Sequence, residues 1–343
     1  MSQLEHTEVV IVGAGLSGIG AAYHLATKCP DRSYLILESR KAMGGTWDLF
    51  RYPGIRSDSD MHTLGYSFKP WESEKAIADG PAILSYVQET ARENALDEHI
   101  RYGHKLTAAN WSSDEAQWIL DISLPETGET VQISCNFLFM CSGYYNYQQP
   151  HDAKLNNIEA FKGTVVHPQF WPEDLQYTDK KVVVIGSGAT AMTLVPAMAA
   201  KAAQVTMLQR SPTYVVSRPS KDWFANGLRK ILPSKWAYTI TRLRNTLMQE
   251  WLYKGARTNP ERSKTALIKM VQKELGDDFD VDTHFTPSYN PWDQRLCLVP
   301  DSDLFTVINN GSASIVTDHI SQFTETGIQL ASGDHLDADI VVT

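Results

Sequence analysis

The chain has 343 residues, of which 43% are hydrophobic, and it carries a formal net charge of −9 at pH 7. This length predicts two or three domains, each able to bury a substantial core. The acidic balance excludes a nucleic-acid partner, because phosphate binding needs a dense surface of lysine and arginine, and it favours small-molecule partners.

The sequence shows no targeting segment and no metal or redox motif. Residues 1–7 lack the basic start and apolar core of a signal peptide, and no apolar stretch reaches the roughly 20 residues that cross a bilayer. We therefore expect a cytoplasmic protein. The cysteines are scattered without a C-x-x-C pair, which predicts reduced core residues and no metal site. They are Cys29, Cys135, Cys141 and Cys297.

The first half of the chain predicts a βα unit followed by further strands. Residues 8–12 form a β-branched run that enters a glycine-rich turn and then a helical pattern over 16–29. Residues 33–38 are predicted to be the next parallel strand, and 81–94 a helix with proline in its first turn. Short alternating segments over about 99–135 predict a small β-meander, which feeds a strand over 137–141.

The second half predicts another βα unit. Residues 144–178 show little periodicity and are interpreted as an interdomain connection. A strand over 181–185, a turn and helix over 186–200 and a strand over 205–208 are expected to follow.

A helical insertion is predicted from residue 222 to about 276, where Trp, Leu and Ile recur at three- and four-residue spacing between many Lys and Arg. This pattern fits an amphipathic element on a membrane surface, but a basic solvated face is the commoner explanation. We favour the solvated face and predict no membrane partner. The chain ends in an apolar run over 340–343, which we expect to leave a sheet unfinished and to favour self-association through an exposed strand edge.

The first glycine-rich turn matches a dinucleotide-binding fingerprint. In residues 13–18 (GAGLSG), Gly13 makes the turn, Gly15 lets the backbone approach a pyrophosphate, and Gly18 allows close helix packing. The next strand ends in Glu38, 20 residues past Gly18, where a carboxylate can accept hydrogen bonds from a ribose diol. The turn lies between a strand and a helix, which favours a nucleotide site such as that of FAD over an incidental turn.

A second fingerprint follows at residues 186–191 (GSGATA), with Gly186 and Gly188 in the glycine positions and alanine in the third. Its helix would begin at Thr190, and Ala189 and Thr190 are expected to be among the residues that bind the cofactor. After the next strand Arg210 and Ser211 replace the expected acid, and this pair suits a 2′-phosphate that a carboxylate would repel. We therefore predict an NADPH site, with a solvated surface arginine as the alternative.

Residues 161–172 (FKGTVVHPQFWP) fit F-x-G-x-x-x-H-x-x-x-W-P, the signature of type I Baeyer–Villiger flavin monooxygenases, with Phe161, Gly163, His167 and Trp171 at its defining positions. The tryptophan distinguishes it from the related N- and S-oxygenating flavin monooxygenases. In this family the histidine is implied to coordinate domain motion; the alternative is a hydrogen-bonded linker histidine without a chemical role.

Two further segments resemble the same family. Residues 44–47 (GGTW) and 51–58 (RYPGIRSD) are similar to its flavin-contacting segment, and residues 38–71 most resemble its mycobacterial, ethionamide-activating branch. The resemblance implies FAD contacts from four of these residues. They are Gly45, Thr46, Trp47 and Asp58.

Residues 292–298 (WDQRLCL) resemble the segment that supplies the family's active-site arginine, which carries over to Arg295. Asp58 matches the carboxylate that orients this arginine, and a purely structural ion pair between the two is the alternative. Relatives often have lysine before the arginine, where this chain has the uncharged Gln294, so the predicted NADPH preference rests mainly on Arg210.

The resemblance implies an enzyme that holds FAD and NADPH together and activates dioxygen on the flavin. Oxygen would react through a C4a-peroxyflavin, which the permanently charged guanidinium of Arg295 would keep anionic. Ketones would give esters or lactones, and thioether or thioamide substrates would give S-oxides.

The predicted fold is α/β, with two Rossmann-like dinucleotide-binding domains, for FAD and NADP, and a helical insertion. We expect an FAD domain over 1–148, a linker over 149–178, an NADP domain over 179–221 and 290–343, and the insertion over 222–289. Family members continue past residue 343, so a truncated nucleotide-binding remnant without oxygenase activity is a second hypothesis. An NADPH:disulfide oxidoreductase is a third, which the lack of a C-x-x-C pair disfavours.

Overall fold

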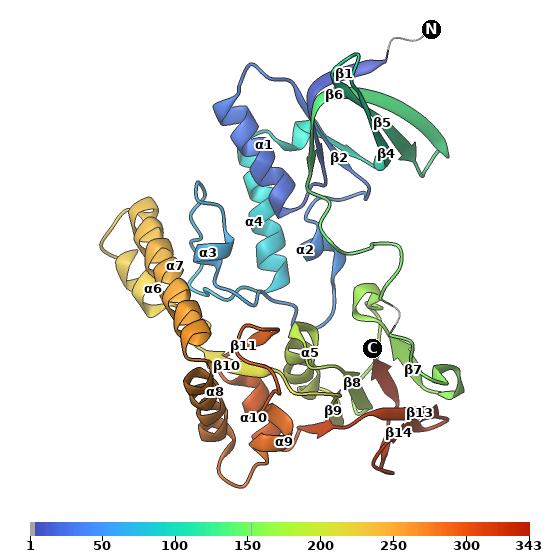
Figure 1. Cartoon of the computed structure of the whole chain (residues 1–343), viewed down its shortest axis with the longest axis vertical. Coiled ribbons are helices and arrows are strands. Elements are labelled where there is room, and N and C mark those ends of the chain that lie inside the picture. The colour runs from blue at the N-terminus through green and yellow to red at the C-terminus, as the bar shows by residue number, and fades with distance from the viewer. Residues whose placement is uncertain (1–3, 152) are drawn as a thin grey trace. The chain divides into compact units, whose positions relative to one another are not determined.

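The computed structural model describes residues 4–151 and 153–343, which form two compact units (Figure 1). The first unit consists of Met1–Leu49 and Gly80–Gln149, and the second of Phe50–Asp79 and Pro150–Thr343. Residues 50–79 lie inside the predicted FAD domain, but in the structure they pack with the second unit. Their turns and short helix carry no local signal of this, because their partners lie more than 100 residues further along the chain.

The first unit is built on a six-stranded sheet with the order β3-β2-β1-β6-β5-β4. The four strands from β3 to β6 are parallel, and β5 and β4 continue the sheet in antiparallel pairing. The strands are β1 (Glu5–Val12), β2 (Tyr34–Glu38), β3 (Ile100–Tyr102), β4 (Lys105–Ser112), β5 (Gln117–Leu124) and β6 (Glu129–Met140). The predicted parallel strands over 8–12 and 33–38 are confirmed.

The meander and the strand predicted over 137–141 are not separate elements. β6 is one strand of 12 residues, whose first half pairs with β5 and whose second half pairs with β1. The prediction of a break was wrong because residues 129–140 contain no glycine or proline that would end the strand.

Two helices of the first unit confirm their predictions. α1 (Leu16–Lys28) follows the first glycine turn and packs on β1 and β2, and α4 (Gly80–Glu93) lies beside α1, as Figure 1 shows in blue and cyan. The short helix α2 (Thr46–Leu49) packs against α4. On the sheet, buried side chains from β1, β2, β5 and β6 form one hydrophobic cluster that includes Val10, Leu37, Leu120 and Ile133.

The second unit is built on a five-stranded parallel sheet with the order β12-β9-β8-β16-β7. The strands are β7 (Thr164–Val166), β8 (Lys181–Ile185), β9 (Gln204–Gln209), β12 (Ala313–Thr317) and β16 (Ile340–Val342). β16 is paired on both sides, so the expectation that the last strand leaves the sheet unfinished was wrong. β7 comes from the segment predicted to be a linker, which therefore contributes an edge strand.

Two smaller sheets complete the strands of the second unit. β10 (Tyr214–Arg218) pairs in parallel with β11 (Leu296–Pro300), and β13 (Ile320–Thr324), β14 (Gly327–Leu330) and β15 (His335–Asp337) form an antiparallel sheet. The helix α5 (Ala189–Ala199) follows the second glycine turn and contacts β8 and β9. The second predicted βα unit is thus confirmed.

The helical insertion is confirmed as α6 (Trp223–Leu228), α7 (Ser234–Thr258) and α8 (Pro260–Leu275), followed by α9 (Val281–Phe285). The short helices α3 (Met61–Leu64) and α10 (Asp303–Asn309) pack beside α7 and α5 respectively. Within the part of the chain that the structure describes, no helix combines the length and the apolar content required to cross a membrane.

The expectation that all four cysteines are core residues was only partly right. All four are free thiols, and Cys135 and Cys297 are buried, but Cys29 is exposed. Cys29 caps the C-terminal end of α1, where its backbone N–H donates to the carbonyl of Leu25. Its environment follows from the end of the helix, which the sequence pattern could place only approximately.

Candidate functional site

The first glycine turn joins β1 to α1 and leaves no room for side chains. Gly13 has φ +105°, and a Cβ there would lie 2.5 Å from the carbonyl oxygen of Cys141. A Cβ on Gly18 would overlap the carbonyl oxygen of Gly13. Both positions therefore require glycine, as the fingerprint predicts.

Glu38 ends β2 beside this turn, and its side chain is buried. Its Oε2 accepts a hydrogen bond of 2.8 Å from the backbone N–H of Ala14, and its Oε1 accepts one of 2.9 Å from the backbone N–H of Arg40. These two bonds hold the carboxylate at the mouth of the turn, where the family resemblance places the ribose of FAD.

The turn opens into a cavity of about 640 Å³ within the first unit. This volume lies in the usual range for small-molecule sites. Gly45 lines the cavity and packs closely on the turn: a Cβ at Gly45 would lie 3.1 Å from the Cα of Gly15. The predicted FAD-binding residues in the lining are Gly13, Gly15, Glu38, Gly45, Thr46 and Trp47. A glycine wall that lets a ligand meet the backbone, together with a fixed carboxylate, fits the adenosine diphosphate half of FAD.

Two lining residues were missed at the sequence level. Arg40 forms an ion pair of 2.7 Å with Asp48, and its guanidinium lies over the ring of Tyr147, 5.6 Å from the ring centroid. Both Arg40 and Tyr147 border the cavity. The position of Arg40, two residues after the acid predicted to bind the ribose, was an available signal; Tyr147 lies in a segment without periodicity and offered none.

The second glycine turn joins β8 to α5 in the second unit. Gly186 has φ +125°, Gly188 is the N-cap of α5, and Ala189 and Thr190 begin the helix. The hydroxyl of Ser187 donates a hydrogen bond of 3.1 Å to the carbonyl of Ser211. The structure thus brings the residue after Arg210 against the turn, as an NADP site requires.

Arg210 and Ser211 follow β9, and both are exposed. Arg210 is therefore accessible to a 2′-phosphate, although a solvated surface arginine would be equally accessible. The geometry leaves both interpretations open, and the role of Arg210 stays a prediction.

Arg295 precedes β11 and lies against the second turn. A Cβ on Gly188 would overlap its guanidinium, so this glycine makes room for the arginine. The backbone carbonyl of Arg295 accepts a hydrogen bond of 3.1 Å from the hydroxyl of Tyr289. The side chain is exposed, which leaves the guanidinium available to a ligand at the turn.

Asp58 lies within electrostatic reach of Arg295. The protein packed around its carboxyl raises the pKa of Asp58, and Arg56 and then Arg295 lower it. Burial likewise raises the pKa of the Cys297 thiol to about 11. The charge of Asp58 adds to this rise, and the charge of Arg295 opposes it. No ion pair or hydrogen bond joins Arg295 to Asp58 among the residues that the structure describes, so the orienting role of Asp58 and the structural ion pair both stay predictions.

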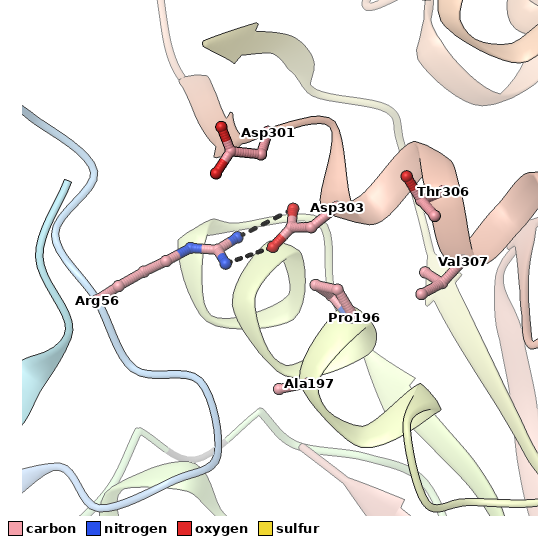
Figure 2. Close-up of a pocket in the computed structure, with 7 residues that line it drawn as sticks. All are labelled: Arg56, Pro196, Ala197, Asp301, Asp303, Thr306 and Val307. Atoms are coloured by element: carbon pink, nitrogen blue, oxygen red, sulfur yellow. Dashed lines mark hydrogen bonds and ion pairs between the residues drawn. The ribbon is translucent and has the colours of Figure 1, made fainter. Parts of the chain in front are cut away.

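Arg56 makes the ion pair instead, with Asp303 at the start of α10 (Figure 2). Its Nη1 and Nη2 donate to the two carboxylate oxygens over 2.5 and 3.4 Å, and Nη2 also donates to the carbonyl of Met192 over 3.3 Å. That carbonyl has no helical partner, because Pro196, four residues later, lacks an N–H. Arg56 therefore satisfies the carbonyl that Pro196 leaves unpaired in α5, and its ion pair with Asp303 fixes the backbone segment that leads to Asp58.

Arg56 and Asp303 also line a cavity of about 380 Å³ in the second unit. Figure 2 shows the guanidinium reaching across to the carboxylate of Asp303, with Pro196 and Ala197 of α5 beside it. Sequence reasoning missed this pair, although a second arginine in the RYPGIR motif and a proline inside a helix were both visible.

We expect Arg56→Leu to lower the free energy of unfolding of the second unit by about 2 kcal/mol, because it strands a half-buried carboxylate and a helix carbonyl. Thermal unfolding followed by circular dichroism measures the change. Lys181→Ala, which removes an exposed ion pair of 3.1 Å with Asp337 in the same unit, is the control and should cost little. Equal effects of the two substitutions would contradict the role given to Arg56.

The signature segment is held by packing and local hydrogen bonds. Phe161 is buried in the core of the second unit, where the centroid of its ring lies 6.4 Å from that of Phe323. A Cβ on Gly163 would overlap the carbonyl oxygen of Asp339, so this position requires glycine.

His167 Nδ1 accepts a hydrogen bond of 3.1 Å from the N–H of Gln169, which is the geometry expected of the linker-histidine alternative. Burial lowers the pKa of His167. Trp171, the last signature position, is half-buried.

Comparison with known proteins identifies the family. The family model described as flavin-binding monooxygenase-like matches residues 67–341, and that of an NAD(P)-binding Rossmann-like domain matches residues 11–73. The chain is 53% identical to the FAD-containing monooxygenase EthA of Mycobacterium tuberculosis over 340 residues, which is 99% of this chain and 69% of that protein. It is 51% identical to the probable FAD-binding monooxygenase AlmA of Acinetobacter baylyi, of which it covers 68%.

Solved structures share the fold. A steroid monooxygenase bound to NADP matches 98% of this chain and 70% of its own with a TM-score of 0.80 and 22% identity. An open structure of cyclohexanone monooxygenase matches 98% of this chain and 73% of its own with a TM-score of 0.79 and 19% identity. The predicted α/β fold with two Rossmann-like dinucleotide-binding units is thereby confirmed, and the chain belongs to the flavin-binding monooxygenase-like family.

Proposed function

We propose that this flavin monooxygenase uses FAD and NADPH to transfer one oxygen atom of O2 to a ketone, giving an ester or lactone, or to a sulfur compound. The observation that carries the proposal is the contact of the Arg295 guanidinium with Gly188 of the second nucleotide turn, with Asp58 in electrostatic reach. Family membership supports the FAD-dependent oxygenase chemistry, and the arginine supports a reaction that develops negative charge on oxygen.

The bound FAD would supply electron storage and oxygen activation, and the chain would supply binding and charge. Gly13, Gly15 and the Gly45 wall would admit the pyrophosphate to the backbone, while Glu38 would accept hydrogen bonds from the ribose. Arg295 would stabilise an anionic oxygen without giving up its proton, because a guanidinium stays charged at any physiological pH.

Asp58 would act as a positioning residue for Arg295. Asp58 is exposed to solvent, and its charge lies within electrostatic reach of the Arg295 guanidinium. Arg56, fixed by Asp303 and by the Met192 carbonyl, would set the backbone from which Asp58 projects.

The substrate class follows from relatives and neighbours. The solved neighbours include steroid and cyclohexanone monooxygenases, which favours ketones, and the likeness of residues 38–71 to the ethionamide-activating branch favours thioamides and thioethers. Incubation with NADPH, O2 and a ketone panel, with products identified by mass spectrometry, tests the proposal. Purified chain that is colourless and does not oxidise NADPH would favour the nucleotide-binding remnant instead. The cytoplasmic location stays a prediction.

Arg210→Ala should raise the KM for NADPH by about tenfold or more and leave the KM for NADH nearly unchanged, because only NADPH carries the 2′-phosphate that a charge-assisted hydrogen bond would hold. Steady-state kinetics with both coenzymes measures the two constants. Lys201→Ala removes another exposed cation of the same unit and should change neither. If Arg210→Ala raises both constants alike, Arg210 is a solvated surface charge.

A further inference from the structure

Helix α7 carries an apolar stripe on the side that faces solvent. Its members recur at spacings of three and four residues, which place them on one face of the helix over roughly 22 Å. Their exposed fractions lie between 39% and 71%. The α7 stripe consists of Trp236, Ile240, Leu243, Leu247 and Trp251.

The opposite face of α7 is attached to the protein partly through polar contacts. The Tyr238 hydroxyl donates a hydrogen bond of 2.9 Å to the carbonyl of Tyr66, and the Asn245 amide donates one of 2.9 Å to Asp60. Arg242 donates to the carbonyl of His62 over 2.9 Å. A surface helix ordinarily buries its apolar stripe and exposes its polar face, so this helix is turned the other way.

Two further large apolar side chains are exposed on the neighbouring helix α6 and in the turn after it. α6 and α7 pack together, as the yellow and orange helices of Figure 1 show. Trp223 and Ile231 are 80% and 76% exposed. Exposed apolar patches on a protein surface mark protein or membrane interaction sites.

The charge around the α7 stripe selects the kind of partner. Residues 223–258 contain seven Lys and Arg and one acidic residue, Glu250. Several of these cations are bound within the protein: Arg242 donates to backbone carbonyls on the attached face, and Arg244, Lys254 and Arg257 form ion pairs. Lys230 and Lys235 are exposed close to the N-terminal end of the stripe. Tryptophan and leucine beside basic side chains are typical of helices that lie in the interface of an anionic membrane.

We propose that the α7 stripe binds the surface of an anionic lipid bilayer, with α7 lying along it and Trp236 and Trp251 at the level of the headgroups. A second copy of the chain fits less well, because two copies that met through this face would bring their basic residues together. The sequence pattern favoured a solvated basic face; the exposure of five large apolar side chains in one line is what reverses that preference.

Co-sedimentation with vesicles tests the proposal. The parent chain should sediment with vesicles of equal parts phosphatidylglycerol and phosphatidylcholine, less so at high salt, and should stay in solution with phosphatidylcholine alone. The variant Trp236→Ser/Leu243→Ser/Leu247→Ser/Trp251→Ser should bind the anionic vesicles about tenfold more weakly or worse, because binding scales with buried apolar area. Circular dichroism verifies that it is folded, as expected for exposed positions.

Trp111→Ser is the matched control, because Trp111 is a 49% exposed tryptophan on β4 of the first unit and should not affect binding. Lys230→Glu/Lys235→Glu should weaken binding to anionic vesicles while leaving the stripe intact. The proposal fails if the parent chain ignores anionic vesicles or if the four-serine variant binds as the parent does. It also fails if, without lipid, size-exclusion chromatography shows an oligomer that the four-serine variant converts to a monomer, since a second copy would then cover the stripe.

Discussion

Arg295→Ala should abolish ester formation while reduction of the flavin by NADPH stays measurable. In the proposed reaction the guanidinium would stabilise the oxygen as it becomes anionic, and removal of one such charge or donor costs on the order of a hundred- to a thousandfold in kcat. Hydride delivery needs no such stabilisation, so the anaerobic loss of flavin absorbance after addition of NADPH should continue. The separation of these two rates is the diagnostic result.

Gln294→Ala is the matched control for this prediction, since Gln294 is the adjacent exposed residue and carries no charge. Arg295→Lys keeps the charge but not the fork of donors and should recover only part of the oxygenation rate. A variant Arg295→Ala that oxygenates ketones at the parental rate would show that the contact of Arg295 with Gly188 is structural. Asp58→Asn should also lower the oxygenation rate, but by less than Arg295→Ala does.

The parts of the fold that sequence reasoning located are those with a local cause. β8 begins and ends at the predicted residues because a run of β-branched side chains stops at Gly186, whose positive φ ends the strand. The same logic located β1, α1 and the helices of the insertion. Each of these elements follows from its own residues and needs no distant partner.

The parts that sequence reasoning missed depend on distant partners. Residues 50–79 join the second unit because Arg56 pairs with Asp303, 247 residues away, and because Gly54 abuts the carbonyl of Thr193 in α5. β16 lies between β8 and β7, a position that no pattern in its three residues could reveal. Pairing across such distances is decided by the whole fold.

The candidate site likewise contains some residues that local patterns predict and others that they do not. The glycines of both turns and Glu38 were predictable from their spacing, because the fingerprint fixes their positions between a strand and a helix. Arg295 and Asp58 came only from the family resemblance, since nothing local distinguishes one exposed arginine from another. That the structure then places Arg295 against Gly188 is independent of the motif that suggested it, which is why the substitution of Arg295 is the sharpest test.

Gly18→Ala should release FAD from the first unit. The added Cβ would overlap the carbonyl oxygen of Gly13, which cannot yield because the N–H of Gly13 donates to Leu37 over 2.7 Å and its φ is +105°. The start of α1 must therefore move away from the turn, and the helix N-terminus that would face the pyrophosphate moves with it. We expect the Kd for FAD to rise about a hundredfold or more and the purified chain to be colourless.

The measurement is the flavin content of purified protein, with FAD titration followed by fluorescence and with circular dichroism as a check on folding. Gly128→Ala is the control, because Gly128 lies in the same unit with φ +75° and no atom within 4 Å of an added Cβ. Gly128→Ala adds a Cβ to the same unit without touching the cavity, so its flavin content should equal that of the parent. Full flavin content in Gly18→Ala would mean that the turn between β1 and α1 is not the FAD cradle, because an overlap at that point cannot be absorbed while the pyrophosphate stays bound.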